Sequence, residues 1–242
     1  MSAGLTLATL RRALLLVSLL VAGPGLAEGQ ADGLAAGQGG EPTAAGGALA
    51  AARAAIERGE GSAARSLLRP LARQGQVEAQ YWLGRAYFYE LSGVNRDFGR
   101  AAYWWRRAAA AGHADAQYKL GGLYFAGRGV AQDDAQAAHW WRAAARQRQP
   151  EAMNNLGALL ANGRGLPADA VLAYALQALS VELGNTLAAE NLRRKEETLS
   201  PTSLAEAQQL AEALRDAARL WQALDALAVV EPQRSAHRSG RR

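Results

Sequence analysis

One sequence block occurs three times at nearly constant spacing, and this internal repeat limits the folds open to the chain more than any other feature. Residues 79–84 (Ala-Gln-Tyr-Trp-Leu-Gly) return after 37 residues at 116–121, and after a further 36 at 152–157. Downstream, Tyr-Trp-Trp-Arg at 103–106 matches His-Trp-Trp-Arg at 139–142. A period of this length predicts a solenoid, in which each unit buries its apolar face against its neighbours.

Each unit is predicted to fold as helix, turn, helix. Ala79, Leu83 and Tyr87 recur at helical spacing on one face of the first helix. An aspartate precedes each second helix, where its side chain can accept hydrogen bonds from free backbone amides. The predicted N-caps are Asp97, Asp133 and Asp169, and the predicted C-cap positions are Gly112, Arg148 and Gly184. Because arginine disfavours the left-handed backbone that glycine adopts there, we expect the join at Arg148 to be strained or built differently.

These units resemble Sel1-like repeats, which are close relatives of tetratricopeptide repeats. The resemblance rests on three motifs: Leu83-Gly84-x-x-Tyr87, Leu120-Gly121-x-x-Tyr124 and Ala101-x-x-x-Trp105-x-x-Ala108. It implies an all-α fold, an α/α superhelix (solenoid) of about four helix-turn-helix repeats with a C-terminal capping helix. It also implies an adaptor that binds a protein or peptide partner.

The predicted boundaries follow the repeat period. The repeats occupy residues 48–192, as a divergent unit at 48–75, clear units at 76–112, 113–148 and 149–184, and a partial unit after them. A closing helix is predicted over 199–228, because Ser200-Pro201 stops the preceding element and the leucines at 204, 210, 214 and 220 recur on a helical face.

The N-terminal segment, 1–27, is predicted to be a signal peptide. Two arginines precede an apolar run at 13–22, and Gly-Pro-Gly follows that run. A membrane-spanning helix needs about 20 apolar residues, so cleavage after Ala27 is favoured over a stable membrane span. The sequence therefore predicts a periplasmic or secreted protein that starts with a disordered, Gly- and Ala-rich linker at 28–47.

The excess of basic over acidic residues in the chain lies at its two ends. The chain has 27 Lys and Arg against 22 Asp and Glu, whereas residues 28–230 hold 21 of each sign. A neutral body gives no reason to expect nucleic acid as a partner. The basic tail at 231–242 is predicted to be disordered, and contact of this tail with an anionic surface is the alternative to a purely solvated tail.

Residue types that carry out chemistry are scarce. The chain has no cysteine and three histidines, which removes thiolate catalysis, disulfides and cysteine-containing metal sites. Gly163-x-Gly165-x-x-Ala168 matches a dinucleotide-binding fingerprint only superficially, because it lies in a helix-to-helix turn and not after a strand. The sequence therefore predicts no enzyme activity, no cofactor and no metal.

Paired tryptophans in two units raise the alternative of a carbohydrate-binding accessory protein of cell-wall or exopolysaccharide assembly. Their recurrence at the repeat period favours packing, because a residue repeated at the same place in each unit usually fills the same space. We assign Trp105 and Trp141 to the core, and Trp104 and Trp140 to contacts between repeats.

The candidate binding surface is the face of each first helix that points away from its own core. With Leu83 facing the core and about 100° per residue, that face combines aromatic and charged side chains, which suits a peptide or helix bound in the concave groove of an envelope scaffold. The predicted groove residues are Glu78, Tyr81, Arg85, Phe88, Tyr89, Asp115, Tyr118, Phe125 and Asn154. Two alternatives stay open: the rings pack sideways between neighbouring first helices, or the binding surface is a basic edge formed by Arg128 and Arg164.

Overall fold

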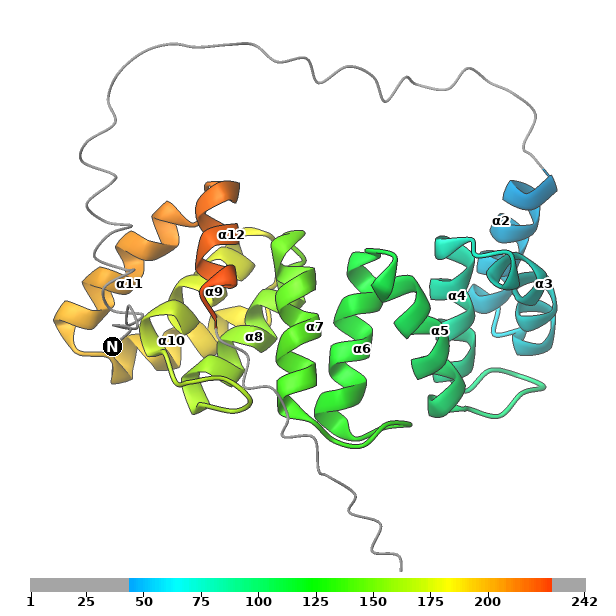
Figure 1. The fold of residues 1–242 in the computed structure, drawn as a ribbon, viewed down its shortest axis with the longest axis horizontal. Coiled ribbons are helices and arrows are strands. Elements are labelled where there is room, and N and C mark those ends of the chain that lie inside the picture. The colour runs from blue at the N-terminus through cyan, green and yellow to red at the C-terminus, as the bar shows by residue number, and fades with distance from the viewer. Residues whose placement is uncertain (1–43, 228–242) are drawn as a thin grey trace, which may run out of the picture.

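The computed structural model describes residues 44–227 and arranges them as a row of eleven α-helices (Figure 1). The helices are α2 (Ala44–Glu57), α3 (Gly61–Arg73), α4 (Val77–Phe88), α5 (Phe98–Ala110), α6 (Ala114–Ala126), α7 (Asp134–Arg146), α8 (Pro150–Asn162), α9 (Ala170–Glu182), α10 (Ala188–Thr198), α11 (Pro201–Ala213) and α12 (Ala217–Asp225). The all-α superhelical fold that the repeat predicted is confirmed. The predicted signal peptide and basic tail, and most of the predicted linker, lie outside the described residues.

Consecutive helices pack side by side along the row. α4 pairs with α5, α6 with α7 and α8 with α9, and α5 and α7 also pack on the first helix of the next unit. α2 and α3 form a further pair that packs on α4 through α3. α2 begins at Ala44, earlier than the predicted start of the repeats at residue 48. Between residues 44 and 227, no helix is both long enough and apolar enough to cross a lipid bilayer.

Aspartate side chains start the second helix of three units, as predicted. Asp97, Asp133 and Asp169 each accept a hydrogen bond from the backbone amide three residues further on, at 2.8, 2.9 and 2.8 Å. Each bond satisfies one of the amides that a helix leaves free at its N-terminus. The positions of these helix starts therefore follow from the local sequence.

The joins between units use one left-handed backbone position. Gly75, Gly112 and Gly184 have φ angles of 87°, 91° and 96°, and Arg148 occupies the equivalent place with a φ of 60°. A side chain in this region costs roughly 1 kcal/mol or more. The Arg148 guanidinium donates a hydrogen bond to the carbonyl of Arg215 at 3.1 Å. The strained join expected at Arg148 is confirmed.

A glycine on the first helix lets the ring of the second helix approach in two units. A Cβ at Gly84 would lie 2.4 Å from Cδ1 of Trp105, and a Cβ at Gly121 would lie 2.6 Å from Cδ1 of Trp141. The two tryptophans are 0% and 3% exposed, and Trp140 is half-buried against the core of the preceding helices. The assignments of Trp105 and Trp141 to the core and of Trp140 to a contact between repeats are confirmed.

The third unit lacks this tryptophan. Gln177 stands at the equivalent position in α9, and its Nε2 donates to the carbonyl of Asn154 at 3.4 Å. A Cβ at Gly157 would lie 2.9 Å from the carbonyl oxygen of Ala173. In this unit the carbonyl of Ala173 and the Cγ of Gln177, which is also 2.9 Å from that Cβ, occupy the place that the indole ring takes in the earlier units.

The predicted closing helix over 199–228 is divided into two helices. α11 ends at Ala213, and the Asp216 carboxylate accepts a hydrogen bond from the amide of Arg219 at 2.9 Å to start α12. α11 packs on α9, whereas α12 turns back onto α7 (Figure 1). There, Trp221 Nε1 donates to the carbonyl of Arg146 at 3.0 Å. The break allows the apolar faces of the two helices to be buried against different units.

Candidate functional site: a groove across the first helices

Two adjoining pockets lie along the first helices of the three clear units. The α4/α6 pocket has a volume of about 180 Å³ and the α6/α8 pocket one of about 270 Å³. The pockets share two lining residues, Gly122 on α6 and Asn155 on α8, and we call the two pockets together the groove. The remaining lining residues are Phe88, Trp105, Tyr118, Lys119, Leu123, Ala126 and Arg128 in the α4/α6 pocket, and Phe125, Trp141, Ala158, Leu159, Asn162 and Arg164 in the α6/α8 pocket.

Aromatic rings from two units form one wall of the α4/α6 pocket. The Phe88 ring lies 5.1 Å from the ring of Trp105 and 5.3 Å from that of Phe98, measured between centroids. The Arg128 guanidinium lies over the Phe98 ring at 5.6 Å. Tyr118, on the neighbouring first helix, lines the same pocket and is half-buried. The pocket is therefore apolar in its wall and cationic at its edge.

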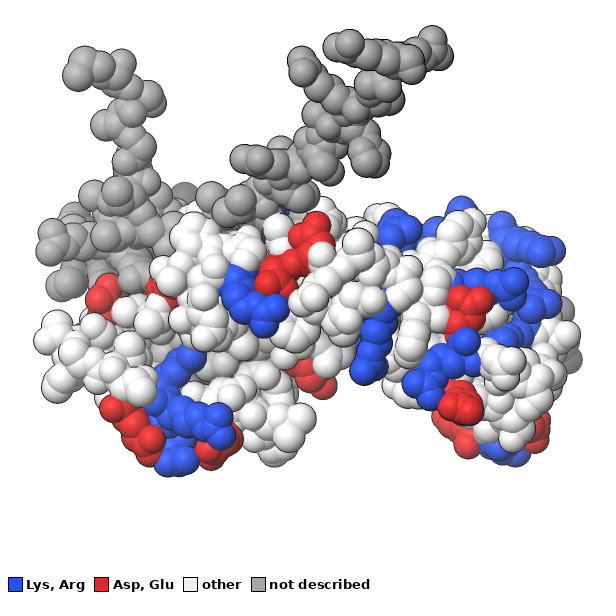
Figure 2. Space-filling model, turned by 90° about the horizontal axis from the view of Figure 1, so that it is seen from below, with Lys and Arg blue, Asp and Glu red and all other residues white. Residues whose placement is uncertain are grey.

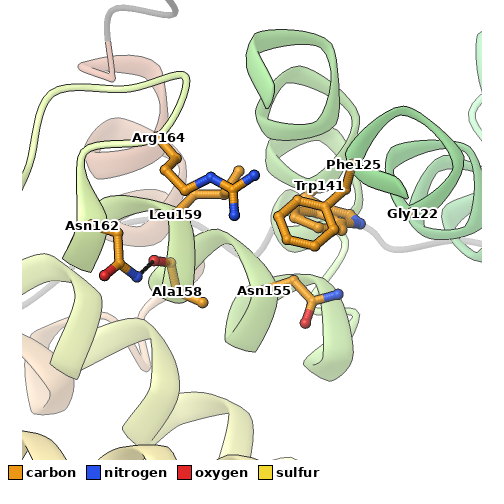
Figure 3. A pocket seen from close by; sticks show the side chains of 8 residues that line it. All are labelled: Gly122, Phe125, Trp141, Asn155, Ala158, Leu159, Asn162 and Arg164. Atoms are coloured by element: carbon orange, nitrogen blue, oxygen red, sulfur yellow. Dashed lines mark hydrogen bonds between the residues drawn. The ribbon is translucent and has the colours of Figure 1, made fainter. Parts of the chain in front are cut away.

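The α6/α8 pocket repeats this arrangement one unit further along (Figure 3). The Phe125 ring lies 5.5 Å from the ring of Trp141, and the Arg164 guanidinium lies over Phe125 at 4.7 Å. In Figure 3, Arg164 lies to the left of these rings and Asn155 lies below them. The amide of Asn162 is engaged with the carbonyl of Ala158 at 2.8 Å. The Asn155 carboxamide oxygen accepts a hydrogen bond from Asn154 Nδ2 at 3.4 Å, and its second lone pair and its NH2 group can still meet a ligand.

The two pockets differ in charge. Arg164 forms a two-point ion pair with Asp134, with nitrogen–oxygen distances of 2.8 and 3.0 Å, so its charge is compensated. Lys119 and Arg128 line the α4/α6 pocket, and neither forms an ion pair with any residue between 44 and 227. No carboxylate of this part of the chain lines either pocket. The α4/α6 pocket therefore carries an uncompensated positive charge and the α6/α8 pocket does not.

The same imbalance extends over the N-terminal units. Residues 44–113 contain ten arginines and five acidic residues, whereas residues 114–227 contain eleven basic and thirteen acidic residues. Figure 2 shows the resulting surface: basic side chains gather over the N-terminal end, on the right, and alternate with acidic ones towards the C-terminal end. Within 44–227, no group of three or more His, Asp or Glu side chains could hold a metal ion.

The structure brings together residues that the sequence analysis had placed on two alternative surfaces. Phe88, Tyr118 and Phe125 were predicted groove residues, and Arg128 and Arg164 were predicted to form a separate basic edge. All five line the groove. The turns that carry the arginines follow α6 and α8, and they place each arginine over an aromatic ring of the preceding unit, Arg128 over Phe98 and Arg164 over Phe125.

Tyr81 lies away from the groove, because a neighbouring unit covers it. Its side chain is 7% exposed, and its ring stacks on the imidazole of His113 with centroids 4.4 Å apart. Burial raises the pKa of Tyr81 to about 12. The expectation that Tyr81 faces a binding groove is wrong, and the sideways packing that was left open describes this residue. The single-helix projection fails here because the covering ring comes from the join before α6.

Five further predicted groove residues line neither pocket. Glu78 accepts a hydrogen bond from Trp82 Nε1 at 2.6 Å and lies 3.2 Å from His113 Nε2. Arg85 lies over the Trp82 ring at 4.4 Å. The others are Tyr89, which is 38% exposed just beyond α4, Asp115, which is exposed at the start of α6, and Asn154, whose carboxamide oxygen accepts hydrogen bonds from Gln177 and Asn191. The groove therefore includes only some of the residues of the predicted surface.

Several groove residues were missed by reasoning from one helix face, among them two tryptophans, a lysine and an asparagine. Trp105 and Trp141 were assigned to the core, yet each also closes the floor of a pocket. Lys119 and Asn155 flank the predicted face, and the lateral approach of neighbouring units brings them into the groove. In the sequence, Lys119 lies directly beside the predicted groove residue Tyr118, and Asn155 lies directly beside Asn154. The repeat, which carries these positions from unit to unit, was the signal that could have indicated them.

Comparisons with known proteins agree on one kind of repeat. A family model described as Sel1 repeat matches residues 77–113, 114–148 and 150–185. Among solved structures, the chain is similar to a protective antigen present in uropathogenic Escherichia coli strains that displays an SLR fold. The two share 28% sequence identity at a TM-score of 0.59, over 80% of this chain and 45% of that one.

A Sel1 repeat protein from Oxalobacter formigenes is also similar, with 35% identity and a TM-score of 0.48, over 52% of this chain and 95% of that one. The chain spans less than half the length of the Escherichia coli antigen. No curated protein matches the chain.

Proposed function

The chain belongs to the Sel1 repeat family through residues 77–185, and from this premise we propose that it is a non-enzymatic interaction scaffold that binds an extended peptide segment of a partner protein in the groove. One observation carries the proposal: two pockets that each combine a phenylalanine–tryptophan pair with an arginine adjoin each other across α6. Consecutive side chains of an extended peptide can occupy such successive pockets, whereas a single small ligand would fill one of them.

The lining of the groove supports a peptide as the ligand. Aromatic and arginine side chains are the residue types enriched where proteins bind each other most tightly. The Asn155 carboxamide, which lines both pockets, can donate to a peptide carbonyl and accept from a peptide amide. These features support protein binding more directly than carbohydrate binding, since Trp105 and Trp141 are too deeply buried to stack on a sugar.

Photo-crosslinking tests the position of the binding site. A photoreactive amino acid at Ala126 or Ala158, both lining residues, should crosslink the same partner, and one at Tyr103, which is 50% exposed on α5, should not. Asn155→Ala should weaken the crosslink by about tenfold or more at an unchanged unfolding midpoint. Equal crosslinking from Tyr103, or a crosslink insensitive to Asn155→Ala, would place the binding surface elsewhere.

We further propose that this scaffold acts in the bacterial cell envelope. Support comes from the sequence of residues 1–27, in which Arg11 and Arg12 precede a short apolar run. Intact-mass measurement of the protein from an envelope fraction is the test. The expected mature chain begins after Ala27, and a chain that retains Arg11 and Arg12 would contradict this proposal.

A further inference from the structure

Gly122 has no role in packing, although it lies inside a helix. A Cβ added at Gly122 would meet no atom within 4 Å, whereas one at the adjacent Gly121 would lie 2.6 Å from the Trp141 ring. Glycine within a helix is destabilising relative to alanine, because it loses more backbone freedom on folding. Packing against Trp141 therefore accounts for Gly121 and leaves Gly122 unexplained.

The other units show that the fold accepts a side chain at this position. Arg85 and Ala158 occupy the places equivalent to Gly122 in the first and third units. Neither residue disturbs the pairing of its helix with the second helix of the unit. The open space above Gly122 is thus a feature of the middle unit, and it lies where the two pockets of the groove meet.

We propose that Gly122 is the point where the backbone of an extended partner peptide crosses α6, with a carboxylate side chain on one side of the crossing and a bulky apolar side chain on the other. This inference rests on the function proposed above. Glycine is the residue that allows another backbone to approach a helix closely, and a side chain at 122 would fill the space that connects the two pockets. The crossing point sets which peptide residue enters which pocket.

Charge assigns the carboxylate to the α4/α6 pocket. Lys119 and Arg128 line that pocket without an ion-pair partner among residues 44–227, and a ligand carboxylate would compensate them. In the α6/α8 pocket, Asp134 already holds the Arg164 guanidinium, and the apolar lining of Phe125, Trp141, Ala158 and Leu159 favours an apolar side chain (Figure 3). Both halves of the ligand are therefore specified by residues on either side of Gly122.

The carboxamide of Asn155 and the missing side chain at Gly122 complete the match to an extended backbone. Asn155 lies opposite Gly122 and lines both pockets, so its carboxamide can form hydrogen bonds with the peptide unit that passes between them. An amphipathic helix fits this site less well, since its backbone groups are already bonded to each other and its side chains would separate it from Gly122.

Selection from a displayed library of short random peptides tests the inference, and the full chain serves as the bait. Selected peptides should share an acidic residue followed or preceded at fixed spacing by a bulky apolar residue. A synthetic peptide of the selected sequence should bind Gly122→Ala roughly tenfold more weakly than the unsubstituted protein. The same variant should unfold at a higher urea concentration, because alanine favours the helix. Loss of binding combined with a gain in stability cannot arise from damage to the fold.

Arg128→Gln and Arg164→Gln form a matched pair for the charge assignment. Arg128→Gln should weaken the peptide about tenfold and abolish the preference for its acidic residue, whereas Arg164→Gln should have a smaller effect, because Asp134 compensates Arg164. Peptides that need Asn155 but lack the acidic residue, or that bind Gly122→Ala with unchanged affinity, would overturn this inference and leave the proposed function standing.

Two other outcomes would overturn the inference through its premise. If no peptide is selected, or if the selected peptides bind Asn155→Ala as well as the unsubstituted protein, the groove is not a peptide site and the proposed function fails with the inference. A dimer of this chain that sediments as such and dissociates in Gly122→Ala would assign the groove to a second copy.

Discussion

The first two clear units and the third join their helices in different ways. We call residues 77–113 and 114–148 the tryptophan repeats and residues 150–185 the glutamine repeat. Trp105 Nε1 donates to the carbonyl of Tyr81 at 3.1 Å, and Gln177 Nε2 donates to the equivalent carbonyl of Asn154 at 3.4 Å. A hydrogen-bond donor therefore occurs at this position in both kinds of repeat, whereas an aromatic ring occurs there only in the tryptophan repeats.

This difference separates two tasks that one tryptophan performs. The hydrogen bond fixes the register of the second helix on the first, and a glutamine amide can do this as well as an indole. The ring also fills the space beside the glycine of the first helix, and in the glutamine repeat the carbonyl of Ala173 and the Cγ of Gln177 occupy that space at Gly157. Register is therefore set by a donor that both kinds of repeat possess, whereas the tryptophan ring additionally lines a pocket of the groove.

The largest expected effect is the loss of a ring from a tryptophan repeat. Trp141→Ala should lower the free energy of unfolding by about 3 to 5 kcal/mol, because it removes a ring that is buried in the core, and Trp105→Ala should act in the same range. Urea denaturation at equilibrium measures the change. A value within about 0.5 kcal/mol of the parent would contradict the assignment of these rings to the core.

Adding a methyl group beneath the ring tests the same contact from the other helix. Gly121→Ala should lower the free energy of unfolding by about 1 to 3 kcal/mol, since the new Cβ would lie 2.6 Å from Trp141. The adjacent Gly122→Ala is the matched control and should raise it by about 0.5 to 1 kcal/mol. Effects of the same sign at the two positions would show that helix propensity, and not contact with the ring, decides the outcome.

The stability that Tyr81 contributes in the first tryptophan repeat should depend on pH in the alkaline range. Burial raises its folded-state pKa to about 12 from an ordinary value of 10.0, so the unfolded chain loses the proton first as pH rises. The stability that this provides is fully present below pH 10 and is lost as the pH approaches 12, by about 2 kcal/mol. The measurement is the difference in unfolding free energy between the parent and Tyr81→Phe as a function of pH, and a constant difference would contradict it.

The glutamine repeat should respond more weakly to truncation at the equivalent position. Gln177→Ala should cost about 1 kcal/mol, because it removes the hydrogen bonds to Asn154 but also removes a buried Oε1 that has no partner. The comparison with Trp141→Ala in the same urea titrations is the test. If the two substitutions cost the same, the ring adds nothing to the hydrogen bond, and the distinction between the two kinds of repeat fails.

The smallest expected effect lies at the join between the two kinds of repeat. Arg148→Gly should raise the free energy of unfolding by at most about 1 kcal/mol, because glycine relieves the left-handed strain but gives up the bond to Arg215 and adds freedom to the unfolded chain. Gly112→Ala, at the equivalent join, should change it in the opposite direction. A destabilised Arg148→Gly protein would show that the contact with Arg215 outweighs the strain.

Much of the fold could be predicted because its determinants are local. Asp97 and Asp133 mark helix starts through bonds to amides three residues away, and the repeat period carries these marks along the chain. The division of the closing segment was missed, although Asp216 is an N-cap of the same kind, because the leucines on both sides of it fit one helical face. Which helix each leucine faces depends on α7 and α9, and the sequence of the segment holds no information about them.

The candidate site was predicted in part, and the misses have one cause. Phe88 and Phe125 project into the groove as a single-helix projection indicates, because each lies near the end of its helix beyond the contact with the next unit. Tyr81 lies near the start of α4, where His113 covers it. A projection of one helix contains no neighbours, so it cannot separate a residue at a lateral contact from one beside open space.

The return of α12 onto α7 changes how the array can come apart. In a linear array each unit touches only the next, so a terminal unit can fray without disturbing the interior. Here Trp221 and Asp225 reach back to Arg146, and the segment from α7 to α12 closes into a loop that includes the whole glutamine repeat. Before the C-terminal end can fray, the contacts of Trp221 and Asp225 with Arg146 in α7 must therefore break. The chain should open from its N-terminal end first, and the last units should exchange their amide hydrogens as one cooperative block.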